Sequence, residues 1–83
     1  MRGAIRYRRA AARATLEHEL SLIDSSIALL AAGGAVRVTL TGLRFAERIL
    51  PAAKRTARAR DVNVRALWRS GGVGCDITLE PLV

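Results

Sequence analysis

The last third of the sequence has the pattern of a β-hairpin whose register is fixed by its turn. Gly71-Gly72 is the predicted two-residue loop, because glycine adopts the positive φ angles that tight hairpin turns need. With that loop, the pairs on one face are Val64–Leu79, Ala66–Ile77 and Trp68–Cys75. The other face holds mostly polar pairs, namely Asn63–Glu80, Arg65–Thr78, Leu67–Asp76 and Arg69–Gly74. One apolar and one polar face are typical of a sheet with a single buried side, so residues 62–80 are predicted to form a C-terminal hairpin with Trp68 and Cys75 in the core.

The segment from Thr15 to Gly34 has the spacing of an amphipathic helix. Its apolar positions recur every three or four residues and form one stripe, made of Leu16, Leu20, Ile23, Ile27 and Leu30. Gly33-Gly34 is expected to end the helix, since glycine favours the left-handed conformation that often follows a helix. Leu22 and Leu29 lie well round the helix from the stripe, so they either widen the core face or contact a subunit partner.

Two further strands and a second helix are predicted from the rest of the pattern. Residues 5–8 and 36–41 alternate between apolar and polar side chains, as short strands do. A helix is expected from about Leu43 to Arg60, with Phe45 on its apolar side. Pro51 lacks a backbone donor, so it should kink or split that helix.

This order of elements predicts the fold class. Strand, helix, strand, helix and hairpin give an α/β two-layer sandwich, in which a four-stranded mixed sheet carries both helices on one face. The chain has 83 residues, 51% of them hydrophobic, so we expect one folded domain over residues 1–83, with a short basic strand and loop in 1–9. A core of this size is sufficient but small, and a homodimer would add stability.

Positive charge is concentrated in two blocks. The net charge of +7 divides into +5 over residues 1–13, −3 over 14–34, +6 over 35–60 and −1 over 61–83. Such segregation indicates a surface directed at a polyanion.

Within the second block, four arginines fall near one line of the predicted second helix, Arg44, Arg48, Arg55 and Arg58. The alternative is a solvated helix face, which is what most charge runs are, but this stripe contains no acidic residue. Contact with backbone phosphates needs cations presented together and backbone donors that point outward. Base stacking is the less favoured mode, because the aromatic residues are only Tyr7, Phe45 and Trp68 and the last two are assigned to the core, with a functional Trp68 as the alternative.

No catalytic, metal or cofactor site is predicted. His18 is the only histidine and lies between Glu17 and Glu19, and Cys75 is the only cysteine. Asp76 and Glu80 are four residues apart on one strand, roughly 13 Å, which is too far for a pair of catalytic carboxylates. The sequence offers no small-molecule substrate site and no membrane-spanning segment. Residues 1–15 could also be read as a transit peptide, although their alternation favours a strand.

The sequence resembles the Alba superfamily, including its bacterial branch around stage V sporulation protein S. The resemblance rests on the element order, on the glycine and basic helix that follow the second strand (residues 36–49), and on the final segment, residues 76–81. It implies a dimeric nucleic-acid-binding protein that contacts its partner through the loop after the first strand, the start of the second helix and the tip of the hairpin. Carried over to this sequence, these surfaces are Arg8 with Arg9, Arg44 with Arg48, and Arg69.

The sequence therefore predicts a non-catalytic DNA- or RNA-binding protein, largely without sequence specificity and located in the cytoplasm, or on the nucleoid if DNA is the partner. The arginines expected to neutralise phosphates are Arg8, Arg9, Arg44, Arg48, Arg55, Arg58 and Arg69. The alternative is a protein-interaction or regulatory module whose basic face meets an acidic protein, and a phage or plasmid accessory protein that occupies another protein's nucleic-acid site would have the same features.

Overall fold

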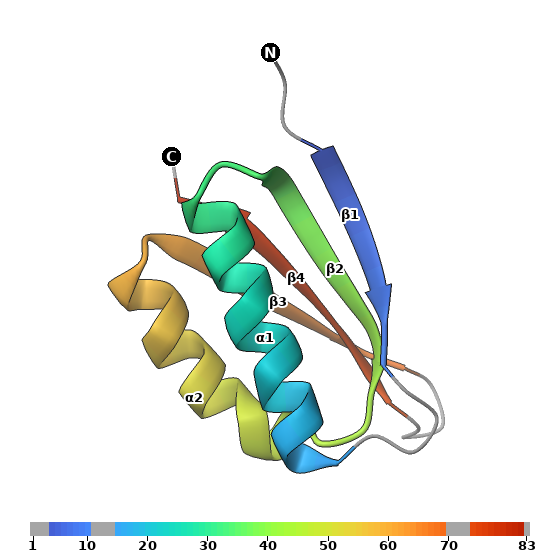
Figure 1. The fold of residues 1–83 in the computed structure, drawn as a ribbon. Coiled ribbons are helices and arrows are strands. Elements are labelled where there is room, and N and C mark those ends of the chain that lie inside the picture. Colours follow the sequence, from blue (N-terminus) through green and yellow to red (C-terminus); the bar gives the residue numbers. More distant parts are fainter. Residues whose placement is uncertain (1–3, 11–14, 70–73, 83) are drawn as a thin grey trace.

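The computed structural model describes residues 4–10, 15–69 and 74–82 and has the predicted architecture (Figure 1). The elements follow the order β1 (Ala4–Arg9), α1 (Leu16–Ala31), β2 (Ala35–Leu43), α2 (Ala46–Ala59), β3 (Val62–Trp68) and β4 (Cys75–Pro81). The four strands form one mixed sheet in the order β1-β2-β4-β3, and both helices cover the same face of it. The α/β two-layer sandwich predicted from the sequence is confirmed.

The directions of the strands follow from the connections between them. β1 and β2 flank α1 and pair in parallel, whereas β4 pairs antiparallel with both β2 and β3. β2 and β3, on either side of α2, therefore run in the same direction with β4 inserted between them. The helical and hairpin connections account for the directions of the strands, whereas the order of the strands in the sheet is seen only in the structure.

The register predicted for the hairpin is also confirmed. Val64 pairs with Leu79, Arg65 with Thr78 and Trp68 with Cys75, as expected from a two-residue loop. The backbone N–H of Arg69 adds a hydrogen bond to the Gly74 carbonyl at 3.2 Å. The turn itself, Gly71-Gly72, lies outside the described residues.

The core lies between the sheet and the two helices. The stripe of α1 provides Ile23, Ile27 and Leu30, and the inner face of the sheet provides Val38, Leu40, Ile77 and Leu79, all of them buried. Leu22 and Leu29 are partly buried against this core, which favours the wider core face over a subunit contact. Burial of these side chains is the main stabilising term for a domain of this size.

Thr15 caps the start of α1, and its other end has the glycine termination that the sequence predicts. The Thr15 hydroxyl caps the first turn by accepting the backbone N–H of His18 at 3.1 Å. After the last turn, Gly33 has a φ of +80°, and the N–H of Gly34 reaches back to the Leu29 carbonyl at 2.9 Å. Gly33 thus takes the left-handed conformation in which a residue with a side chain is strained.

Helix α2 differs from its prediction at its N-terminus. It begins at Ala46, three residues later than expected, so Arg44 and Phe45 precede the helix. Pro51 lies inside it, but α2 is one uninterrupted helix of 14 residues. Pro51 lies on the exposed side of the helix. Because proline has no N–H, the backbone carbonyl four residues earlier receives no hydrogen bond from it, and on this side that carbonyl can be hydrated.

The prediction that Trp68 lies in the core is wrong. Cys75 is fully buried, but its partner Trp68 is 52% exposed. Along the same side of β3, exposure rises from Val62, which is buried, through Val64 to Ala66 and Trp68. β3 is an edge strand, and the twist of the sheet carries its second half out from under α2.

Candidate nucleic-acid interface

One end of the sheet gathers segments that are far apart in the sequence. Arg9 at the end of β1 pairs with Thr41, while Leu43 at the end of β2 pairs with Cys75, which also pairs with Trp68. β1, β2 and β3 therefore end, and β4 begins, at the same end of the sheet. Both helices also begin there (Figure 1).

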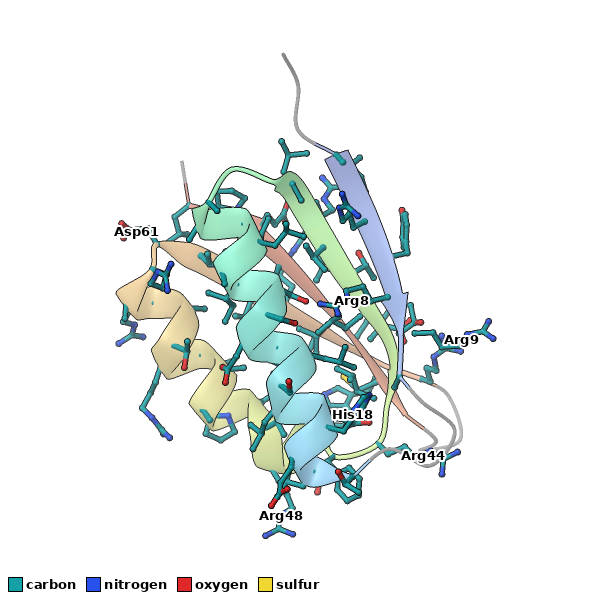
Figure 2. All side chains as sticks on the ribbon, viewed as in Figure 1. Arg8, Arg9, His18, Arg44, Arg48 and Asp61 are labelled. Atoms are coloured by element: carbon teal, nitrogen blue, oxygen red, sulfur yellow. The ribbon has the colours of Figure 1, made fainter. Side chains whose placement is uncertain are left out.

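Four of the predicted arginines lie at this end, and we call three of them, Arg9, Arg44 and Arg48, the basic end. Figure 2 shows Arg9 directed away from the helices, Arg44 in the turn before α2, and Arg48 at the first turn of α2. All three are exposed, and none forms an ion pair with any of the described residues. Across four strands spaced about 4.8 Å apart, this end of the sheet is roughly 14 Å wide.

A buried carboxylate fixes the turn that carries Arg44. Glu19 of α1 is fully buried. Its two side-chain oxygens accept the N–H of Arg44 at 2.9 and 3.1 Å, and one of them accepts the N–H of Phe45 at 2.8 Å. Phe45 provides no side-chain cap for α2, so Glu19 satisfies backbone donors that the start of the helix leaves open.

Glu19 has a role that the sequence analysis missed. Glu19 belongs to the segment of net charge −3, residues 14–34, but it also falls on the helical stripe, three residues after Leu16 and four before Ile23. An acid at a core position of a helix signals a buried partner. Since Glu19 occupies these N–H groups, a phosphate near the start of α2 would meet the side chains of Arg44 and Arg48 more readily than the backbone at residues 44–45.

Trp68 lies beside the start of α2. A hollow of about 300 Å³ is lined by Leu43, Arg44, Phe45, Glu47, Arg48, Trp68 and Gly74. The exposed indole therefore adjoins two cations of the basic end and one carboxylate, that of Glu47.

Arg69 also lies at this end of the sheet, and it forms an ion pair with Asp76. Its guanidinium donates to both oxygens of Asp76, at 3.0 and 3.2 Å, and one of those oxygens also accepts the Gly42 N–H at 3.0 Å. The Gly42 hydrogen bond, aided by Arg69, holds the pKa of the Asp76 carboxyl below its usual value. This network ties the irregular end of β2 to the base of the hairpin, and it balances the charge of Arg69.

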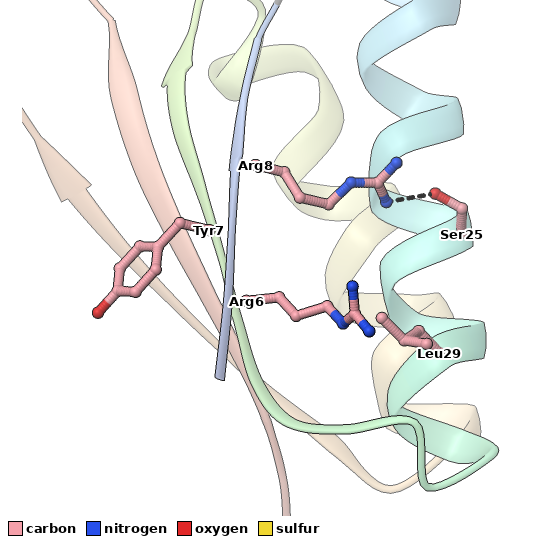
Figure 3. A pocket seen from close by; sticks show the side chains of 5 residues that line it. All are labelled: Arg6, Tyr7, Arg8, Ser25 and Leu29. Carbon is pink, nitrogen blue, oxygen red and sulfur yellow. Dashed lines mark hydrogen bonds between the residues drawn. The ribbon is translucent and has the colours of Figure 1, made fainter. Parts of the chain in front are cut away.

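Arg8 points the other way from Arg9 and lies against α1. Figure 3 shows Arg6 and Arg8 on the helix side of β1 and Tyr7 on the opposite side. The guanidinium of Arg8 donates to the Ser25 hydroxyl at 2.8 Å and to the hydroxyl of Ser26, which is buried, at 3.1 Å. It lines a hollow of about 540 Å³ between β1 and α1, together with Arg6, Tyr7, Ser25 and Leu29. The structure therefore places Arg8 in the packing between sheet and helix, apart from the basic end.

Arg55 and Arg58 form a separate group with Lys54, which we call the outer basic patch. These three exposed residues, with Ala59, line a hollow of about 320 Å³ on α2. Arg55 follows Arg48 by about 10 Å along the helix axis, and Pro51 lies between them. Because Arg44 precedes α2, the predicted stripe divides into a cluster at the start of the helix and a patch on its second half.

On the open face of β2 and β3, the arginines form ion pairs. Arg37 and Arg65 both pair with Glu80, and Arg69 pairs with Asp76. Tyr7 and Leu67 are the most exposed apolar side chains on this face, at 73% and 70%. Arg37, Arg65 and Arg69 thus differ from the arginines of the basic end, which have no acidic partner among the described residues.

The groups considered for catalysis are dispersed. His18 is exposed at the start of α1, Cys75 is buried in the core, and Asp76 and Glu80 are each engaged by arginines. Within the described ranges, no three His, Cys, Asp or Glu side chains lie close enough together to hold a metal ion. Neither helix of the described chain has the length and apolar character needed to cross a membrane.

Comparisons with known proteins return no relative of this chain. No protein-family model, no curated protein and no solved structure matches it.

Proposed function

We propose that this chain binds nucleic acid without catalysing a reaction and that it contacts phosphates through the basic end, Arg9, Arg44 and Arg48. The observation that carries the proposal is the contrast between two sets of arginines. Arg37, Arg65 and Arg69 of the central and β3 side of the sheet are paired with Glu80 or Asp76, whereas the three of the basic end are exposed and lack an acidic partner in the described part of the chain. Cations that are not neutralised internally are available to phosphates.

The resemblance to the Alba superfamily supports the same surface. It implicates the loop after the first strand, the start of the second helix and the tip of the hairpin, and the described residues next to these segments, Arg9, Arg44 and Arg69, lie at the same end of the sheet. Membership of that superfamily, a homodimer, and a cytoplasmic or nucleoid location belong to the proposal. Arg55 and Arg58 of the outer basic patch extend the contact along α2, and Arg69 adds to it if Asp76 is displaced.

The proposal predicts a steep dependence of affinity on salt. If three phosphates are neutralised, the association constant should fall about 40-fold between 50 and 200 mM salt. Filter binding with mixed-sequence DNA and RNA measures this fall. Equal affinity for unrelated sequences is expected, because the basic end has no side chain arranged to read bases.

A double variant tests the surface itself. Arg44→Glu with Arg48→Glu should weaken binding to all sequences at least tenfold. The matched control is Arg55→Glu with Arg58→Glu, which changes the net charge by the same amount on the outer basic patch. A larger loss in the first pair supports the basic end, whereas equal losses indicate that only total charge matters, and no binding to either polymer at low salt contradicts the function.

One feature favours a second candidate, a protein-interaction module. The open sheet face exposes Tyr7 and Leu67, together with Ile5 at 52%, while Arg37, Arg65 and Arg69 on it are paired. A partner protein on this face would be unaffected by the Arg44 and Arg48 variants and weakened by Tyr7→Ala, which separates the two functions.

A further inference from the structure

Trp68 is exposed at a place where a core residue was expected. It is the only tryptophan in the chain, 52% exposed, at the last position of the edge strand β3. Trp68 pairs with Cys75 of β4, whose side chain is buried. The backbone of Trp68 is therefore fixed in the sheet, while α2 leaves its indole uncovered.

The surroundings of Trp68 combine an apolar base with cations. The hollow that Trp68 lines is also lined by Leu43, which is fully buried, by Phe45, which is half-buried, and by the exposed Arg44 and Arg48. Glu47 is the one acid in this lining. An aromatic face next to clustered cations is the arrangement that binds single-stranded nucleic acid, with a base on the ring and phosphates on the arginines.

We propose that Trp68 stacks an unpaired nucleobase, so that the chain prefers single-stranded nucleic acid to continuous duplex. This inference rests on the proposed function and adds the class of substrate. In a duplex, each base is stacked between its neighbours and does not offer its face to a side chain, whereas the bases of single strands can turn outward. Arg44 and Arg48 neutralise the phosphates that flank the stacked base.

The single tryptophan makes the experiment direct, because all indole emission comes from Trp68. Fluorescence is recorded during titration with a short thymidine oligonucleotide, a duplex of equal length and inorganic polyphosphate, which has charge but no base. Binding of each polymer is followed independently by its effect on sedimentation. The single strand should quench the emission at saturation, and the duplex and polyphosphate should bind with little quenching.

A substitution measures the contribution of the ring. Stacking on one aromatic residue contributes a factor of about 5 to 150 in affinity, so Trp68→Leu should weaken single-strand binding by a factor in this range and leave duplex binding unchanged. Trp68→Phe should retain part of the affinity. The control is Tyr7→Leu, which removes another exposed aromatic ring from the opposite face of the sheet, and far-ultraviolet circular dichroism verifies that each variant folds.

The outcomes separate this inference from the proposed function. Quenching by the single strand alone, with a selective loss in Trp68→Leu, supports the stacking role. Equal single-strand affinity in Trp68→Leu and the parent, or equal quenching by duplex and single strand, overturns it while nucleic-acid binding stands. Absence of binding to any of the polymers overturns the proposed function as well.

Discussion

The Glu19 carboxylate in α1 accepts the backbone N–H of Arg44, the residue that begins the turn into α2, at 2.9 and 3.1 Å. This contact links the two helices across 25 residues of sequence and sets the position of an exposed arginine of the basic end. A buried acid of the core therefore supports a cation of the candidate site. The carboxylate accepts the N–H groups of the two residues that precede α2, Arg44 and Phe45, and so joins the starts of the two helices.

Removing the carboxylate should destabilise the fold. Glu19→Ala leaves the N–H groups of Arg44 and Phe45 without their partner, and we expect a loss of about 3 kcal/mol in the free energy of unfolding. Glu19→Gln keeps one acceptor oxygen and should lose about half as much. Urea denaturation followed by circular dichroism measures both.

The control for this prediction is Glu17→Ala in the same turn of α1. Glu17 is exposed, and its favourable interaction with the helix dipole contributes less than about 1 kcal/mol. If Glu19→Ala unfolds at the same urea concentration as Glu17→Ala, the carboxylate does not hold the turn.

Cys75 should be unreactive in the native protein. Burial raises the pKa of its thiol, the neighbouring charge of Asp76 adds to the increase, and a backbone hydrogen bond from Leu67 opposes it. Because the thiolate is the reactive form, a disulfide-exchange reagent should label Cys75 only after denaturation. A Ser21→Cys variant adds an exposed thiol on α1 and should react at once, and equal rates for the two thiols would contradict the prediction.

The parts of the fold that were predictable are those that local patterns determine. Period-two alternation and a two-glycine turn leave one register for β3 and β4, and the structure has it. The stripe that includes Ile23 and Ile27 likewise requires a helix with that side buried. In these segments, the backbone geometry and the burial of side chains favour the same answer.

The failures concern side chains whose surroundings come from distant elements. Trp68 lies on the predicted face, but how far α2 covers an edge strand is decided by the twist of the sheet. Glu19 is buried where it accepts backbone N–H groups at the start of α2. The sequence of α1 alone does not show that these donors are its partners. For β1, alternation predicts a strand, while the parallel register with β2, Arg6 opposite Val38 and Arg8 opposite Leu40, decides which side chains face α1.

Acid should weaken the connection between β2 and the hairpin. The Gly42 N–H, followed by Arg69, keeps the pKa of Asp76 below its usual 3.8 in the folded state. A carboxyl with a lowered folded-state pKa stabilises the protein at higher pH, and that contribution is lost as the pH falls below about 3.8 and passes through the lowered pKa. Asp76→Asn should therefore be less stable than the parent at neutral pH, and the difference should shrink in acid, as thermal unfolding at a series of pH values would show.

Arg69→Ala tests which partner of Asp76 matters more. The Gly42 hydrogen bond is the largest cause of the lowered pKa, so this variant should keep most of the acid dependence. If Arg69→Ala and Asp76→Asn lose the acid dependence equally, the ion pair is the dominant contact and the role given to Gly42 is wrong.

Adjacent arginines on β1 should separate stability from binding. Arg8 donates to Ser25 and to buried Ser26, so Arg8→Ala should lower the free energy of unfolding by about 1 kcal/mol and change nucleic-acid affinity little. Arg9 is exposed on the other side of the strand, so Arg9→Ala should leave stability within about 0.5 kcal/mol and reduce the slope of log affinity against log salt by about 1. Denaturation and salt titrations of both variants give the four values. The opposite result, with Arg8→Ala impairing binding in a fully stable protein, would move the phosphate contact to the hollow between β1 and α1.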